Sequence, residues 1–168
     1  MILIGIGSNL AASGFDSPRA TAAAAVRRLA ERGIRIARLS SWYMSEPVPR
    51  SDQPWYVNAL AVVATVLSPN DLLDLLLDTE TEFGRERSVP NAARTLDLDL
   101  LDYDGRACAT ARLILPHPRL HERRFVLAPV AEVAPEWRHR QLGLTAAELL
   151  ARLPPGQELR VLGGNSSE

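Results

Sequence analysis

The chain has 168 residues, a formal net charge of −1 and 46% hydrophobic residues, which predicts one soluble domain that buries its own core. All 19 basic residues are arginine, so sites that depend on a P-loop lysine, a Schiff-base lysine or a lysine general base are excluded. The near-zero charge gives no general attraction to nucleic acid or membranes, and the single cysteine, Cys108, excludes an internal disulfide.

Residues 1–7 carry no basic lead-in and no run long enough for a secretory signal, and no stretch reaches the roughly 20 apolar residues of a membrane span. We therefore expect a cytoplasmic protein with no membrane or nucleic-acid partner. No internal repeat interrupts the sequence. We expect a single domain over 1–168, in which residues 156–168, Gly/Ser-rich at their end, form a loose tail.

Apolar periodicity, helix caps and Gly/Pro turns predict the order of the elements. In chain order we expect a strand over 1–7, a helix that Asp16-Ser17-Pro18 starts and that runs over 20–31, strands over 34–45 and 56–67, a helix over 69–83 with Ser68 as its N-cap, and a strand over 96–101. Helices should follow from Leu120, broken at Pro129, and from Thr145 to Leu153. This β-α-β-β-α-β order indicates an α+β fold: a ferredoxin-like sandwich whose antiparallel sheet carries the helices, with extra C-terminal helices.

The fourth predicted strand carries the strongest functional signal. Leucines alternate with Asp97 and Asp99, so the leucines should enter a core while both carboxylates emerge on the opposite face, about 7 Å apart. Two carboxylates at that spacing can bind one Mg²⁺ or hold two ions between them, with phosphate and water completing the coordination. The alternative is an amphipathic edge strand that its acids merely keep soluble.

Basic side chains surround this strand in the sequence. They are Arg85, Arg87 and Arg94 before it, and His117, Arg119 and Arg123 after it. Such a cluster repels itself unless anions fill the space, and a triphosphate with Mg²⁺ meets that demand. A second candidate region runs from 45 to 58, where Asn58 offers a planar amide. Trp42, Trp55 and Tyr56 could form a flat apolar wall there, although such aromatics are often plain core.

Five ordered motifs carry a resemblance to a known family. They are Gly7-Ser8-Asn9-Leu10, Asp52-Gln53-Pro54 with Tyr56-Val57-Asn58, Glu80 with Gly84-Arg85-x-Arg87, Arg94-Thr95-Leu96-Asp97-Leu98-Asp99, and Pro116-His117 with Arg123-x-Phe125. Over residues 2–153 the chain resembles the 6-hydroxymethyl-7,8-dihydropterin pyrophosphokinases of folate biosynthesis. The resemblance implies transfer of pyrophosphate from ATP to the hydroxymethyl group of the pterin, with release of AMP.

The resemblance also implies a role for each matching residue. Asp97 and Asp99 would bind two Mg²⁺ ions, and Arg85 and Arg94 would act with them in the transfer. The remaining ATP contacts would be Glu80, Arg87, Leu100, His117 and Arg123. The pterin contacts would be Ser45, Val48, Tyr56, Asn58 and Phe125. The expected partners are these two small-molecule substrates alone, with the protein a monomer.

Three positions depart from the common family pattern: Asn91-Ala92-Ala93 replaces Trp-Gly-Pro, Pro118 replaces a tyrosine, and Leu77 replaces a glutamine. Two other hypotheses stay open at this point. One is a different Mg²⁺-dependent phosphoryl- or nucleotidyl-transferase on the same scaffold. The other is a non-catalytic ferredoxin-like module that binds RNA or a small regulator, which would present stacking aromatics and a basic face.

Overall fold

The computed structural model describes residues 1–86, 90 and 92–163. The strands are β1 (Ile2–Ser8), β2 (Arg35–Leu39), β3 (Tyr43–Ser45), β4 (Tyr56–Ala64), β5 (Asp97–Tyr103), β6 (Cys108–Ala109), β7 (Ile114–Leu115) and β8 (Leu159–Val161). The helices are α1 (Pro18–Glu31), α2 (Pro69–Glu82), a 3-10 turn (Leu120–Glu122), α3 (Arg124–Val133) and α4 (Ala146–Arg152). No helix in this part of the chain is long and apolar enough to cross a membrane.

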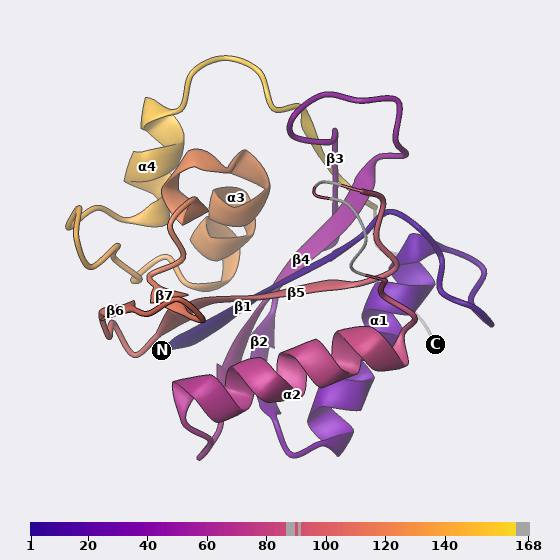
Figure 1. Ribbon diagram of the computed structural model, residues 1–168. Coiled ribbons are helices and arrows are strands. Elements are labelled where there is room, and N and C mark those ends of the chain that lie inside the picture. The colour runs from indigo at the N-terminus through magenta and orange to yellow at the C-terminus, as the bar shows by residue number, and fades with distance from the viewer. Residues whose placement is uncertain (87–89, 91, 164–168) are drawn as a thin grey trace.

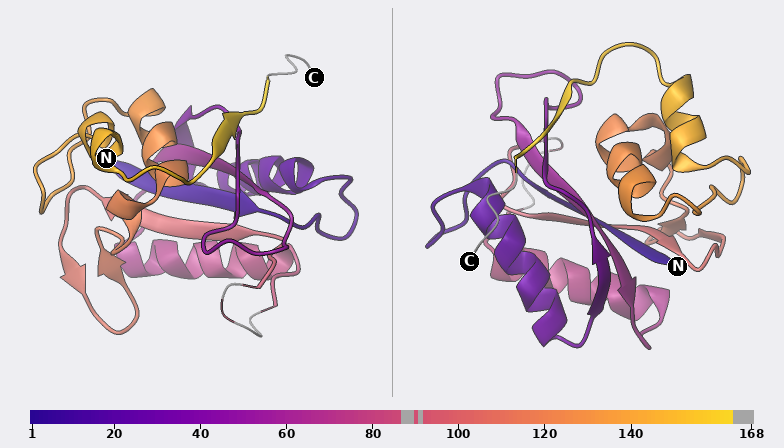
Figure 2. Two further views of the ribbon diagram at one scale, coloured as in Figure 1. Left: turned by 90° about the horizontal axis from the view of Figure 1, so that it is seen from above. Right: turned by 180° about the vertical axis from the view of Figure 1, so that it is seen from behind.

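The main sheet is antiparallel, with the strand order β5-β1-β4-β3-β8 and with β2 pairing along the remainder of β4. Helices α1 and α2 lie on one face of this sheet, and α3 and α4 lie on the other (Figure 1). The views in Figure 2 show the same layers from above and behind. The arrangement confirms the predicted ferredoxin-like α+β fold, and α3 and α4 are the extra C-terminal helices.

Both helices of the first layer begin at capping motifs that the sequence predicts. The Ser17 hydroxyl accepts from the backbone N–H of Ala20, and the Ser68 hydroxyl accepts from that of Asp71. A proline occupies the first helical position in each case, where its missing N–H costs nothing. These caps fix where α1 and α2 start, and burial of their apolar faces against the sheet holds them there.

Strand β1 divides the core into two layers. Ile2, Ile4 and Ile6 point towards α1 and α2, whereas Leu3 points towards α3 and α4. Gly5 and Gly7 follow Leu3 on that second face, where they place no side chain above the sheet. One end of the second face is therefore open, and this end contains the pocket.

The predicted strand over 34–45 is wrong as a single element, because the structure breaks it into β2 and β3. Ser40 interrupts the strand: its hydroxyl accepts from the backbone N–H of Leu60 at 2.9 Å. At the next residue, the backbone N–H of Ser41 donates to the Glu132 carboxylate instead of to a strand. Side-chain acceptors thus replace strand partners at the break, which periodicity alone does not reveal.

The C-terminal predictions also need correction. The helix expected from Leu120 is a 3-10 turn followed by α3, and α3 continues through Pro129 instead of breaking there. A single proline removes one backbone bond, and the buried apolar face of α3 outweighs that loss. The tail is not loose over Leu159–Val161, which pairs with β3 as β8. Residues 164–168 lie outside the described part of the chain.

Leu29 of α1 is fully buried, whereas Leu39 of β2 is 39% exposed. We expect Leu29→Ala to lower the free energy of unfolding by about 2–5 kcal/mol, because it leaves a cavity between α1 and the sheet. The same substitution at Leu39 should cost less than about 1 kcal/mol. Urea denaturation followed by circular dichroism measures both, and equal losses would contradict the core assigned here.

Candidate active site

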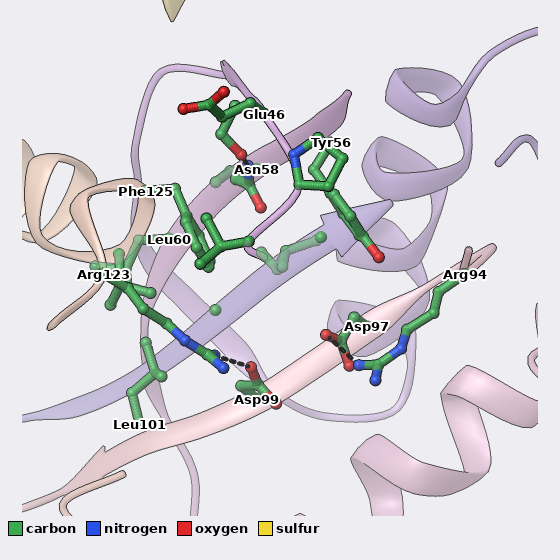
Figure 3. A pocket seen from close by; sticks show the side chains of 18 of the residues that line it. Glu46, Tyr56, Asn58, Leu60, Arg94, Asp97, Asp99, Leu101, Arg123 and Phe125 are labelled. Atoms are coloured by element: carbon green, nitrogen blue, oxygen red, sulfur yellow. Dashed lines mark hydrogen bonds and ion pairs between the residues drawn. The ribbon is translucent and has the colours of Figure 1, made fainter. Parts of the chain in front are cut away.

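A pocket with a cavity volume of about 270 Å³ lies on the second face of the sheet, between the start of α3 and the proline-rich loop after β3. Figure 3 shows its lining residues, which come from β1, β4, β5, the loop and α3. Asp97 and Asp99 lie on one side of the pocket, and Asn58, Tyr56 and Phe125 lie on the other. Acidic and planar groups that are distant in sequence therefore share one cavity.

Two glycines form the floor of the pocket. In the sheet register, Gly7 stands between Asp97 and Asn58, and Gly5 stands between Asp99 and Leu60. A Cβ atom added at Gly7 would lie 3.3 Å from the Asn58 side-chain oxygen, closer than most real contacts. Because neighbouring strands lie about 4.8 Å apart, the backbones of β5 and β4 are about 10 Å apart here, with only the glycines of β1 between them. Gly5 and Gly7 both line the pocket.

Both acids face into the pocket, as the alternation of β5 predicts (Figure 3). One oxygen of the Asp97 carboxylate accepts a hydrogen bond from the Arg85 guanidinium at 2.8 Å. The other oxygen accepts one from the Arg94 guanidinium at 2.9 Å. Asp99 lies 4.0 Å from the Arg123 guanidinium. Burial, together with the negative charge of Asp97, raises the pKa of Asp99 to about 7, although the positive charge of Arg123 opposes the shift. These acids are thus enclosed among arginines, which excludes a strand whose acids merely meet solvent.

The chemistry of these donors fits Mg²⁺. Hard carboxylate oxygens from two positions of one strand face the same cavity. Within the described residues, no group of three or more histidines, cysteines and acids is placed to hold a metal ion. Mg²⁺ is commonly bound by one or two carboxylates together with substrate phosphates, so the two acids suit an ion that arrives with a nucleotide.

Glu80 and Leu100, expected to contact ATP, do not line the pocket. Glu80 is 2% exposed at the end of α2, accepts from the backbone N–H of Leu98 at 2.8 Å and pairs with Arg85. The Leu100 side chain belongs to the core beneath the sheet, as alternation with Asp99 requires. Glu80 therefore lies behind β5 in contact with Arg85, and the Leu100 side chain packs in the core.

Two other expectations fall on the arginine-rich loop. Arg87 and Asn91 lie outside the described residues. Arg85 is held between Glu80 and Asp97, so its guanidinium stands at the edge of the acidic side of the site.

His117 lines the pocket after β7, beside the arginines. Its Nδ1 atom accepts from the backbone N–H of Arg119 at 3.2 Å, which leaves the proton of a neutral ring on Nε2. Burial, with help from the positive charge of Arg123, lowers the pKa of His117 to about 4. The ring is therefore a neutral hydrogen-bond donor at pH 7.

All five residues expected to contact the pterin line the same pocket: Ser45, Val48, Tyr56, Asn58 and Phe125. The Asn58 amide donates to the Ser45 hydroxyl at 2.7 Å, which fixes its orientation. Trp42 and Trp55, expected as part of a flat wall, do not line it. Trp42 packs against the core, and Trp55 lies under the Arg160 guanidinium.

Sequence reasoning missed the role of Asn9. This residue is 1% exposed, and its side-chain oxygen accepts from the backbone N–H of Arg94 at 2.7 Å. Its amide nitrogen donates to Gln53 and to the Pro54 carbonyl, both at 3.2 Å. Asn9 thus ties the arginine loop to the proline-rich loop. The signal available in the sequence was an asparagine directly after a glycine-rich strand.

Comparison with known proteins agrees with this geometry. A family model described as 7,8-dihydro-6-hydroxymethylpterin-pyrophosphokinase matches residues 3–135. Three similar relatives, from Synechocystis, Methylorubrum extorquens and Pseudomonas aeruginosa, are each named 2-amino-4-hydroxy-6-hydroxymethyldihydropteridine pyrophosphokinase.

The extent of these matches differs. The Synechocystis protein is 43% identical over 72% of this chain, and the match spans 62% of its own length. The Methylorubrum protein is 37% identical over 94% of this chain and 96% of its own, and the Pseudomonas protein is 40% identical over 91% of each. With most of its length matched by the family model, the chain belongs to the 7,8-dihydro-6-hydroxymethylpterin-pyrophosphokinase family.

Proposed function

We propose that this chain transfers pyrophosphate from ATP to the hydroxymethyl group of 6-hydroxymethyl-7,8-dihydropterin, releasing AMP, as a step of folate biosynthesis. The observation that carries this proposal is that one cavity joins two carboxylates and several basic groups to a polar, aromatic wall. The first side suits a metal-bound triphosphate, and the second suits a planar heterocycle with amide-like edges. Family membership and the printed names of the relatives support the same reaction.

In this proposal Asp97 and Asp99 hold two Mg²⁺ ions. The ions would neutralise charge on the phosphates and orient them. Arg85 and Arg94 now donate to the two oxygens of Asp97, and both guanidiniums would be available to phosphate oxygens once Asp97 held a metal ion.

The basic groups would position the phosphates. Arg85 and Arg94 lie on the Asp97 side of the pocket, and Arg123 and His117 lie on the Asp99 side. Arginine can meet two phosphate oxygens at once through its planar fork, and neutral His117 can donate one hydrogen bond from Nε2. Glu80 would hold Arg85 in place, and Arg87 remains a proposed nucleotide contact.

The pterin would lie over the glycine floor, against Asn58 and Ser45. The amide of Asn58 is already oriented by Ser45, so its recognition of a ring edge needs little rearrangement. Tyr56, Val48 and Phe125 would enclose the faces of the ring. This places the hydroxymethyl group towards the acids on β5.

The reaction then follows from position and charge. The hydroxymethyl oxygen gives up its proton to solvent and forms a bond to the β-phosphorus of ATP. The bond from that phosphorus to the oxygen bridging the α-phosphorus breaks, and AMP departs with that oxygen. Such transfers depend mainly on alignment and on stabilisation of the phosphate charge. No covalent nucleophile on the protein takes part in this proposal. We further propose that the protein acts as a cytoplasmic, single-domain monomer.

We predict that Asp97→Asn and Asp99→Asn each reduce AMP release below about 1% of the wild-type rate, because each removes a charged metal ligand. AMP is quantified by chromatography after incubation with Mg²⁺, ATP and the dihydropterin. Asp78→Asn on α2, where the side chain is 72% exposed, is the matched control and should keep wild-type activity. Release of ADP or pyrophosphate by the wild type would refute the proposed reaction, and an active Asp97→Asn would refute the metal assignment.

A second prediction concerns the charge state of His117 in the protein free of metal and nucleotide. Because the folded pKa of His117 is about 4, its imidazole signal in an NMR titration should remain that of the neutral ring from pH 8 down to about pH 5. The unfolded ring protonates near pH 6.5, so the burial of His117 should cost stability progressively as the pH falls below 6.5. A His117 signal that titrates near pH 6.5 would contradict the neutral donor.

A further inference from the structure

The segment over 156–162, here called the strap, lies beyond residues 3–135 that match the family model. It runs from the end of α4 across to the edge of the sheet at β3, the yellow trace in Figures 1 and 2. Its strand β8 pairs with β3, so that Leu159 lies opposite Ser45. The strap therefore reaches a wall of the pocket from outside the residues that the family model matches.

One end of the strap contacts the start of α3. The Gln157 side-chain oxygen accepts from the backbone N–H of Arg124 at 2.8 Å, and its amide donates to the Glu122 carbonyl at 2.9 Å. The N-cap residue of α3 is Arg123, whose side chain makes no capping bond. The first N–H groups of a helix have no partner within the helix, so Gln157 supplies from the strap a bond that α3 lacks.

The next residue of the strap, Glu158, contacts the loop on the opposite wall. The backbone N–H of Glu158 donates to the Glu46 carboxylate at 3.0 Å, and the Glu46 N–H donates to the Glu158 carbonyl at 3.4 Å. Glu46 lies between Ser45 and the loop residue Val48, which both line the pocket. Two adjacent strap residues therefore join the two walls.

The backbone of Gln157 itself indicates that this position is specifically held. Its φ is +53°, in the left-handed region that residues other than glycine seldom occupy. Such a conformation persists where surrounding contacts fix it, and here the two side-chain bonds to Arg124 and Glu122 do so.

The helix start that Gln157 caps bears two side chains of the pocket. Arg123 faces Asp99 at 4.0 Å, and Phe125 forms part of the wall next to it. Adjacent arginines at a helix N-terminus are unfavourable because the helix dipole is positive there, so this turn depends on outside support. We propose that Gln157 is a positioning residue, which sets Arg123 and Phe125 by capping α3. This inference rests on the proposed function.

The test compares three variants in steady-state kinetics at a temperature where each is folded. Gln157→Met keeps the size and Cβ of the side chain but removes both bonds, and should lower kcat/KM for the dihydropterin about 10-fold. Gln157→Glu keeps the acceptor for Arg124 and should recover part of that loss. The control is Val161→Thr, also on the strap, whose side chain is 61% exposed and should keep wild-type kinetics.

A structural readout separates positioning from general stability. In Gln157→Met, amide hydrogen exchange at Arg124 should accelerate while exchange in α1 stays unchanged, because only the start of α3 is released. Wild-type kinetics in Gln157→Met, whatever its melting temperature, would overturn the positioning role, as would equal losses in the Val161→Thr control. A wild-type chain that releases no AMP would instead overturn the function on which the inference rests.

Discussion

The site depends on the balance between the carboxylates of β5 and the guanidiniums around them. Asp97 and Asp99 project from one strand into a cavity that is only partly open to water, where unpaired charges are costly. Arg85 and Arg94 neutralise the first acid, and Arg123 approaches the second. The charged side chains that pair with one another in the pocket are also the groups that a metal-bound triphosphate would require.

The two faces of the sheet have different roles: one forms the closed core, and the other carries the pocket. The face covered by α1 and α2 is a closed apolar core, and Leu98 and Leu100 belong to it. The opposite face is covered by α3 and α4 at one end only, and at the other end the glycines of β1 place no side chain between the acids of β5 and the residues of β4. One strand, β5, therefore contributes to stability through its leucines and to the site through its acids.

Patterns local in sequence predicted much of this. The alternation in β5 predicted that both acids share a face, and the Ser-Pro caps predicted where α1 and α2 begin. Contacts between distant segments were not predictable in the same way. The position of Glu80 behind β5, the break at Ser40 and the pairing of β8 depend on partners at least 18 residues away. The position of Gly7 between Asp97 and Asn58 depends on the register of three strands, and no single sequence motif determines that register.

The central claim is that Asp97 and Asp99 together bind the metal ions that accompany the nucleotide. Anomalous diffraction from crystals grown with Mn²⁺, a non-hydrolysable ATP analogue and the dihydropterin tests it most directly. The account predicts manganese within about 2.5 Å of oxygens from both carboxylates, with Arg94 moved from Asp97 to phosphate. Manganese bound elsewhere, with Asp97 still paired to Arg85 and Arg94, would contradict it.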